Sequence, residues 1–352
     1  MIKSRLTEIL SSFSENEFRE FGRYVSSPYF NSNKKLISAF SYFKKFAGDL
    51  TSEKCTKENL FREIFPDKSY RDTEARKLLS GLTKLAEGFL GQKVFDADKF
   101  EQNINLSGVL ITKGLLVPAE KIINELQNSA EKEKINGQHF FYDLMKIQIK
   151  KKSIELKKES FQTGDLTEDK INSYLLNYFI SFSTKIVQNI RAKQYYNLIP
   201  KEHELIKFFS LLDIDSFVQW LEDTGNEYSE TLIMNLCIIK CVNNEYDGPA
   251  YKRFRELLLK SLGKYSHFEL NNLFTCLQGI QIRRIRENAP EALPELFEIN
   301  NLILANEAFA FFPGGNMPYS TFVTMVTIGI SYEKYEWVKD FISKYTPLLQ
   351  EK

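Results

Sequence analysis

Residues 228–263 read YSETLIMNLCIIKCVNNEYDGPAYKRFRELLLKSLG, and this stretch decides the class of fold. Between Leu232 and Val242 nearly every position is apolar, which predicts a helix that is covered on all sides. After the turn at Gly248-Pro249, apolar residues recur at the spacing of one helix face. These residues are Tyr251, Phe254, Leu257, Leu258 and Leu262. A fully buried helix joined to an amphipathic one indicates the inner unit of a stack of helical hairpins.

The same helical periodicity continues outward in both directions, and no run of alternating apolar and polar residues predicts a strand. The spacing predicts helices near 98–113, 117–133, 137–160, 168–197, 201–212, 215–223, 228–243, 249–263, 267–287, 291–311, 319–331 and 333–349. The pairs 228–263, 267–311 and 319–349 begin 39 and then 52 residues apart. Tetratricopeptide repeats have about 34 residues and HEAT or armadillo repeats about 40–47. We therefore expect residues 96–352 to form a degenerate α-solenoid rather than a regular repeat.

Residues 1–95 predict a separate N-terminal unit of five short helices. Ser14 and Glu17 fit a capping box, Asn33 and Thr56 fit helix N-caps, and a longer helix is expected from about Asp72 to Leu90. Each predicted helix carries one apolar stripe, so the five can close around a small core. The fold class we expect is all-α, with this unit followed by the solenoid.

Length and composition exclude several classes of protein. The chain has 352 residues, a formal net charge of +1 and only four cysteines, which argues against a disulfide scaffold or a disordered tail. The polar run that follows Lys3 and Arg5 does not fit a signal peptide. The longest uncharged stretch, 308–332, is broken by Pro313 and Pro318, so we expect no membrane helix. A soluble, cytoplasmic protein is the expectation.

Aromatic residues make up 14% of the chain, and two interpretations are open. An AT-rich genome raises the content of Phe and Tyr without any functional reason. Exposed aromatic side chains could instead stack bases or peptides. Because most of these residues have helical spacing and aliphatic neighbours, we expect them in the core.

Charge is distributed unevenly along the chain. Residues 1–200 have 32 basic and 25 acidic side chains, whereas residues 201–250 have 3 basic and 10 acidic ones. A nucleic-acid track needs a continuous positive face. An acidic zone between more basic ones therefore favours a protein partner.

Three stretches resemble a known group of proteins. They are FREF and VSSPYFN within 18–31, FP, KLLSGLTKL and FL within 65–90, and WVKDFISKY at 337–345. Together they resemble uncharacterised, all-helical, tetratricopeptide-like proteins of Bacteroidetes and related bacteria. The resemblance implies a helical repeat protein. The shared motifs are packing motifs, so it implies no chemistry and no catalytic residue.

Candidate metal and catalytic residues are few. Cys237 and Cys241 lie one helical turn apart, but a structural zinc needs four ligands, and we expect both thiols to be core residues. His203-Glu204 begins like a zinc-protease motif, yet Lys207 occupies the position of the second histidine. The loop 313–318 has two glycines but no preceding strand, so it predicts a helix connection rather than a phosphate cradle. We expect no cofactor, no metal and no enzymatic activity.

Two basic stretches suggest an alternative function. The helix 146–158 has six lysines, of which Lys150, Lys151 and Lys157 are the candidate contacts for nucleic acid, beside a stripe of Met145, Ile149 and Leu156. Arg283, Arg284 and Arg286 form a second basic group. Both are also explained by the solvated faces of amphipathic helices.

The C-terminal helix holds the candidate partner-binding residues. Its expected buried stripe is Tyr335, Val338, Phe341, Ile342 and Tyr345. Trp337 falls among the polar residues of the opposite side, where it either packs on Phe341 or, with Leu348 and Leu349, awaits a partner.

Two hypotheses on function follow from this reading. The first is a non-enzymatic scaffold that binds a peptide or helix of a partner protein; the second is a nucleic-acid-associated factor that uses the basic stretches.

Overall fold

The computed structural model describes residues 4–47, 49–50, 52–135, 137–158, 167–195, 197–200, 202–225, 228–243, 246–310 and 314–349. Within these residues the protein is all-α, with 17 α-helices, two short 3-10 helices and two isolated β-bridges. The expected fold class is therefore confirmed. The chain divides into two compact units, Met1–Asn105 and Leu106–Lys352, which we describe separately.

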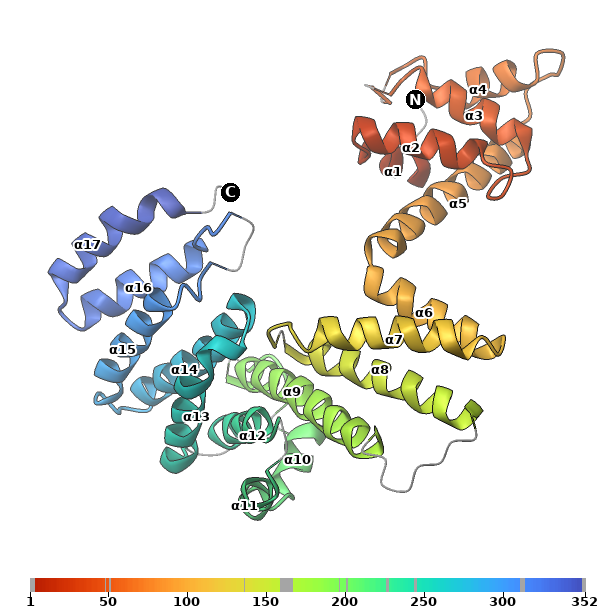
Figure 1. Cartoon of the computed structure of the whole chain (residues 1–352). Helices are drawn as coiled ribbons and strands as arrows, with labels where there is room; N and C mark the ends of the chain where they lie inside the picture. The colour runs from red at the N-terminus through yellow and green to blue at the C-terminus, as the bar shows by residue number, and fades with distance from the viewer. Residues whose placement is uncertain are drawn as a thin grey trace. The chain divides into compact units, whose positions relative to one another are not determined.

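Unit 1 has five helices and the start of a sixth (Figure 1). They are α1 (Arg5–Ser11), α2 (Glu15–Ser26), α3 (Lys34–Lys44), α4 (Lys57–Ile64), α5 (Asp72–Ala97) and α6 (Lys99–Thr112). The predicted caps are present: Ser14 and Glu17 form a capping box, and the Asn33 and Thr56 side chains accept from Lys35 N and Asn59 N. Helix α5 continues seven residues beyond the expected end at Leu90, since no proline follows to stop it.

The core of unit 1 is a cluster of phenylalanine rings. Phe21 has ring centroids of Phe13, Phe40 and Phe89 within 5.2–5.6 Å. The rings come from α2, α3, α5 and the turn before α2, so they hold the long helix α5 against the short ones.

Unit 2 contains the remaining helices, which lie close to the predicted ranges. They are α7 (Leu116–Ala130), α8 (Gly137–Lys158), α9 (Thr167–Tyr195), α10 (Glu204–Ser210), α11 (Ile214–Thr224), α12 (Ser229–Asn243), α13 (Gly248–Ser261), α14 (His267–Arg286), α15 (Ala292–Ala305), α16 (Tyr319–Ser331) and α17 (Tyr335–Tyr345). Helix α15 ends six residues before the expected 311, because Glu307 adopts a φ of 50° that ends the helix.

Helices of unit 2 pack mainly on their neighbours in sequence, as helical hairpins do. The pairs α12–α13, α14–α15 and α16–α17 each pack together, as predicted. One pairing is not between neighbours in sequence: α9 packs on α8 and also on α12 (Figure 1). Of the two helices between them, α10 packs on α9 and α12, and α11 packs on α12.

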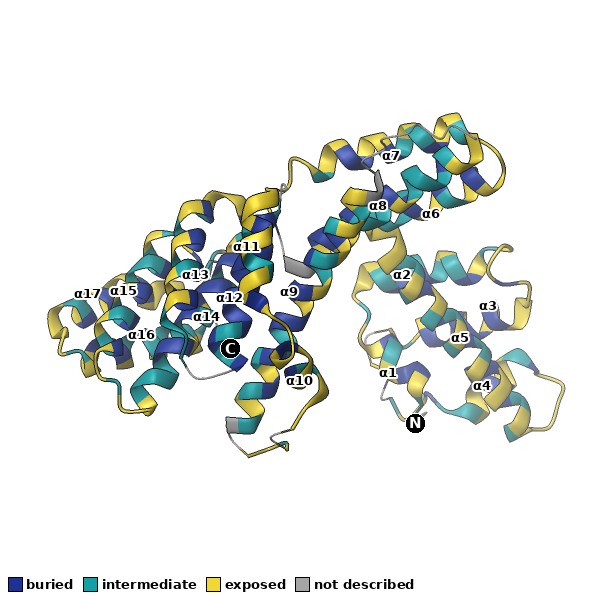
Figure 2. Cartoon of the chain, turned by 90° about the horizontal axis from the view of Figure 1, so that it is seen from below, coloured by how far each residue is buried: buried dark blue, intermediate teal, exposed yellow. Residues whose placement is uncertain are grey.

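Helix α12 is the most buried helix of unit 2. All positions from Leu232 to Ile239 are less than a tenth exposed, and Figure 2 shows the helix largely in the colour of buried residues. The expectation of an all-apolar inner helix is confirmed.

Helix α8 buries a different stripe from the expected one. Ile149 and Leu156 are 43% and 52% exposed, whereas Ile147 and Ile154 are buried. Both pairs are seven residues apart, so periodicity alone could not distinguish them. Helices α7 and α9 both pack on α8, and Ile147 is fully buried.

Candidate functional site

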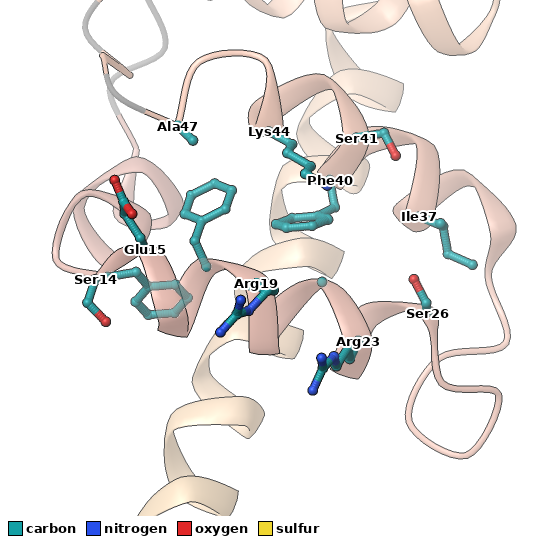
Figure 3. A pocket seen from close by; sticks show the side chains of 13 residues that line it. Ser14, Glu15, Arg19, Arg23, Ser26, Ile37, Phe40, Ser41, Lys44 and Ala47 are labelled. Atoms are coloured by element: carbon teal, nitrogen blue, oxygen red, sulfur yellow. The ribbon is translucent and has the colours of Figure 1, made fainter.

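Unit 1 has an open groove between α2 and α3 with a volume of about 740 Å³ (Figure 3). Its lining residues come from α2, α3 and the turns next to them. They are Phe13, Ser14, Glu15, Phe18, Arg19, Gly22, Arg23, Ser26, Ile37, Phe40, Ser41, Lys44 and Ala47.

The floor of this α2–α3 groove is aromatic. The ring centroids of Phe18 and Phe40 are 5.3 Å apart, and these side chains are only 7% and 5% exposed. Phe13 is half-buried and meets Phe18 edge-on. The floor therefore offers apolar contact but no open ring face.

Cations dominate the rim of the α2–α3 groove. Figure 3 shows Arg19 and Arg23 on α2 and Lys44 on α3, with the Phe40 ring between the two helices. Arg19 donates to the Asn16 side chain at 2.6 Å. Within the described residues, neither Arg23 nor Lys44 has an acidic side chain at ion-pair distance. Two cations at the rim are thus available to a ligand.

Unit 2 has a second groove, between α9 and α14 with α12 at its base. It consists of two adjoining cavities of about 380 and 240 Å³ that share Gln188, Asn189, Thr275 and Cys276. Gly279 also lines it, and a Cβ built there meets no atom within 4 Å. The groove therefore has free space above α14.

The lining of this α9–α14 groove combines a larger apolar surface with polar side chains, several of which already pair with one another. The Cys276 thiol lies 2.9 Å from Gln188 Oε1, and Lys185 Nζ lies 3.4 Å from Glu269 Oε2. Asn272 donates to the same carboxylate at 3.2 Å. Amide and hydroxyl side chains of this kind can pair with the backbone of a bound peptide.

Two arginines at one end of the α9–α14 groove donate hydrogen bonds to the carbonyl groups at the C-terminal end of α12. Arg283 donates to the carbonyls of Cys241 and Val242 at 2.8 and 3.3 Å, and Arg191 donates to the Asn243 carbonyl and, at 2.9 Å, to its side chain. The last carbonyls of a helix lack partners within it and attract cations. Burial, together with the nearby Arg283 guanidinium, lowers the pKa of Arg191.

The structure places the basic candidates in separate environments. Arg284 stacks over the Tyr246 ring at 4.1 Å and pairs with Glu291 at 2.9 Å. On α8, Lys150 and Lys151 are half-buried and Lys157 is exposed. Burial and the neighbouring Lys170 lower the pKa of Lys151. Arg286 is exposed and lines the α9–α14 groove.

The C-terminal candidates are tied to their own unit. Trp337 is half-buried and stacks on Phe341 with ring centroids 5.2 Å apart. Met317 N donates to Leu348 O at 2.7 Å, which holds the segment directly after α17 beside the start of α16. Leu348 is 38% exposed and Leu349 half-buried.

The buried stripe of α17 differs from the expectation. Val338, Phe341 and Tyr345 are buried as predicted, but Tyr335 and Ile342 are 56% and 41% exposed. The indole of Trp337 packs against α15 and α16. Helix α17 therefore presents Trp337, rather than Ile342, to these two helices.

Cysteine and histidine candidates have structural roles here. Cys237 and Cys241 are buried as predicted, and burial raises the pKa of Cys237 to about 11 and that of Cys241 to about 12. His203 is the N-cap of α10. Of the loop 313–318, Pro313 lies outside the described residues, and α16 begins directly after Pro318 as expected. No cluster of three His, Cys, Asp or Glu suited to a metal occurs in the described parts of the chain.

Sequence reasoning missed both grooves. The α2–α3 groove had a local signal in the sequence, because Arg19 and Arg23 lie one helical turn apart beside Phe18. The second had none, because Gln188 and Cys276 are 88 residues apart and meet only through tertiary packing.

The comparisons with known proteins give no family or relative. Neither protein-family models, nor curated proteins, nor solved structures match the chain. Among the described helices, none has the length and hydropathy to cross a membrane.

Proposed function

We propose that the chain is a non-enzymatic, tetratricopeptide-like scaffold that holds a peptide or helix of a partner protein, in the cytoplasm. The observation that carries the proposal is the α9–α14 groove, which is open, has room above Gly279 and presents amide and hydroxyl side chains beside a larger apolar surface. Stacked helical pairs commonly use such extended surfaces to bind partner segments.

The polar groups of this groove suit the backbone of a peptide, and its apolar surface suits the side chains of the same peptide. Asn189 and Thr275 are exposed in the stretch that the two cavities share. An extended segment has donors and acceptors along its length, and unpaired ones are costly when buried. Amide and hydroxyl side chains can both donate and accept hydrogen bonds, so they can pair with the backbone groups of the bound segment and reduce the cost of burying them.

The alternative, a nucleic-acid-associated factor, has less support. Arg283 is engaged by the carbonyls of α12, and Arg284 by Tyr246 and Glu291. A cation that already has a protein partner neutralises a phosphate less effectively, so two of the five predicted contacts, Arg283 and Arg284, are less available.

The test is to fill the groove without disturbing the fold. Gly279→Trp places a large ring in the free space on α14. Gly91→Trp makes the same change at an exposed position of α5, where a Cβ also meets no atom within 4 Å. Tagged full-length wild type and both variants are incubated with native lysate, and captured proteins are compared by quantitative mass spectrometry. We expect a partner that wild type and Gly91→Trp retain and Gly279→Trp loses. Identical sets of captured proteins for all three would refute binding in this groove.

A further inference from the structure

We propose that the α2–α3 groove of unit 1 binds an acidic amphipathic helix of a partner protein, with the partner's carboxylates on Arg19, Arg23 and Lys44 and its apolar residues over the aromatic floor. This second surface lies in a different unit from the α9–α14 groove, so it goes beyond the function proposed above.

The arrangement of charge carries the proposal. Arg19 and Arg23 are four residues apart and so project from successive turns of α2, while Lys44 lies on the facing helix α3 (Figure 3). A helix with Asp or Glu at the same four-residue spacing presents carboxylates at matching intervals. Glu15 is the single acidic residue of the groove lining.

Arg23 and Lys44 differ from two paired cations of unit 1, Lys93 and Lys45. Lys93 lies 3.0 and 3.3 Å from the carboxylates of Glu17 and Glu20, and Lys45 lies 2.6 Å from Glu63. Arg23 and Lys44 have no such acidic neighbour in the described chain. A partner carboxylate can therefore pair with them without first displacing one from this protein, which favours an acidic partner over a neutral one.

The floor of the α2–α3 groove indicates which uncharged side chains the partner helix should have. Phe13 and Ile37 are half-buried and line it beside the nearly closed rings of Phe18 and Phe40. Aliphatic side chains on one face of a helix can cover such a surface. A nucleic acid gains less here: base stacking needs an open ring face, and Glu15 repels a phosphate.

The test measures binding of a defined probe to the full-length chain by fluorescence anisotropy. The probe is a labelled peptide of about 16 residues with Leu at i, i+3, i+4 and i+7, Glu at four-residue spacing beside the Leu stripe, and Ala and Gln elsewhere so that like charges do not unfold the helix. Companion peptides carry Lys for Glu, or Ala for Leu, and single-stranded RNA is a further probe. We expect binding of the Glu/Leu peptide, weaker binding of the Glu/Ala peptide and none of the Lys peptide.

Charge reversal then locates the site. Arg23→Glu/Lys44→Glu is compared with Arg62→Glu/Lys77→Glu, which makes the same change in net charge at exposed residues that do not line the groove. Arg62, like Arg23, lies in the last turn of its helix. We expect the groove variant to raise the Kd of the Glu/Leu peptide at least about tenfold and the control to leave it nearly unchanged. No binding of that peptide, equal losses in both variants, or a groove variant that loses RNA binding alone would overturn the proposal.

Discussion

The indole Nε1 of Trp337 donates a 3.0 Å hydrogen bond to the side-chain oxygen of Asn301 and so joins α17 to α15. The same ring meets Phe297 edge-on at 5.0 Å and stacks on Phe341. These contacts fix the last helical hairpin on the preceding one. They also leave Tyr335 and Ile342, rather than Trp337, as the exposed apolar residues of α17.

Trp337→Ala should destabilise the protein by about 3 kcal/mol, at the lower end for loss of a buried tryptophan, because the ring is partly exposed. Trp220→Ala is the control, since this side chain is 55% exposed, and it should cost less than about 1 kcal/mol. Urea unfolding followed by circular dichroism measures both. Equal, small effects would mean that Trp337 is free for a partner.

Gly329 lies where α16 packs against Trp337 and Val338 of α17. A Cβ there would stand 2.6 Å from Val338 Cγ2 and 3.2 Å from the Trp337 ring. Gly329→Ala should therefore cost about 1–3 kcal/mol through overpacking. Gly279→Ala, on an open helix face, should instead stabilise by about 0.5–1 kcal/mol. Urea midpoints that shift in the same direction for both variants would contradict this packing.

The burial of α12 predicts a large effect of one truncation. Leu236 is 1% exposed, and Leu236→Ala should cost about 2–5 kcal/mol. Leu212→Ala serves as the control because Leu212 is 44% exposed. If the free energy of unfolding of Leu236→Ala falls by less than about 0.5 kcal/mol, α12 is not the inner helix.

Local patterns of the sequence predicted the helices and several caps, because periodicity and N-cap residues act within one or two turns. Helix α12 was recognisable since it is apolar on every side. Periodicity did not predict which residues of α8 and α17 are buried. Ile149 and Ile342 have the spacing of a buried stripe but are exposed, because the contacts with other helices involve Ile147 and Trp337 instead. The grooves depend entirely on such contacts.

Arg283 should contribute to stability by capping α12. Arg283→Met keeps most of the aliphatic stem but leaves the carbonyls of Cys241 and Val242 without these donors. We expect a loss of about 1–3 kcal/mol in urea unfolding. Lys207→Met is the comparison, at an exposed position in the last turn of α10, and should cost less than about 0.5 kcal/mol. A neutral Arg283→Met would leave this arginine available for another role.

The capping box of α2 predicts a specific dependence of stability on pH. The Ser14 backbone N–H, 2.9 Å from Glu17 Oε2, and the Lys93 ammonium lower the pKa of Glu17 from 4.5 to about 2. Because the folded-state pKa is depressed, this carboxylate stabilises the fold fully above pH about 4.5. That contribution is lost as the pH falls through about 2.

Glu17→Gln should therefore be less stable than wild type at pH 6, and the difference should shrink steadily between pH 5 and pH 2. Lys93→Met removes one of the two causes, so NMR titration should place the pKa of Glu17 above its wild-type value of about 2 but still below 4.5. The remaining depression comes from the Ser14 hydrogen bonds, which Lys93→Met leaves in place. A wild-type Glu17 carboxyl that titrates near 4.5 would show that the box is open in solution, and the entry to the α2–α3 groove would then lack this fixed turn.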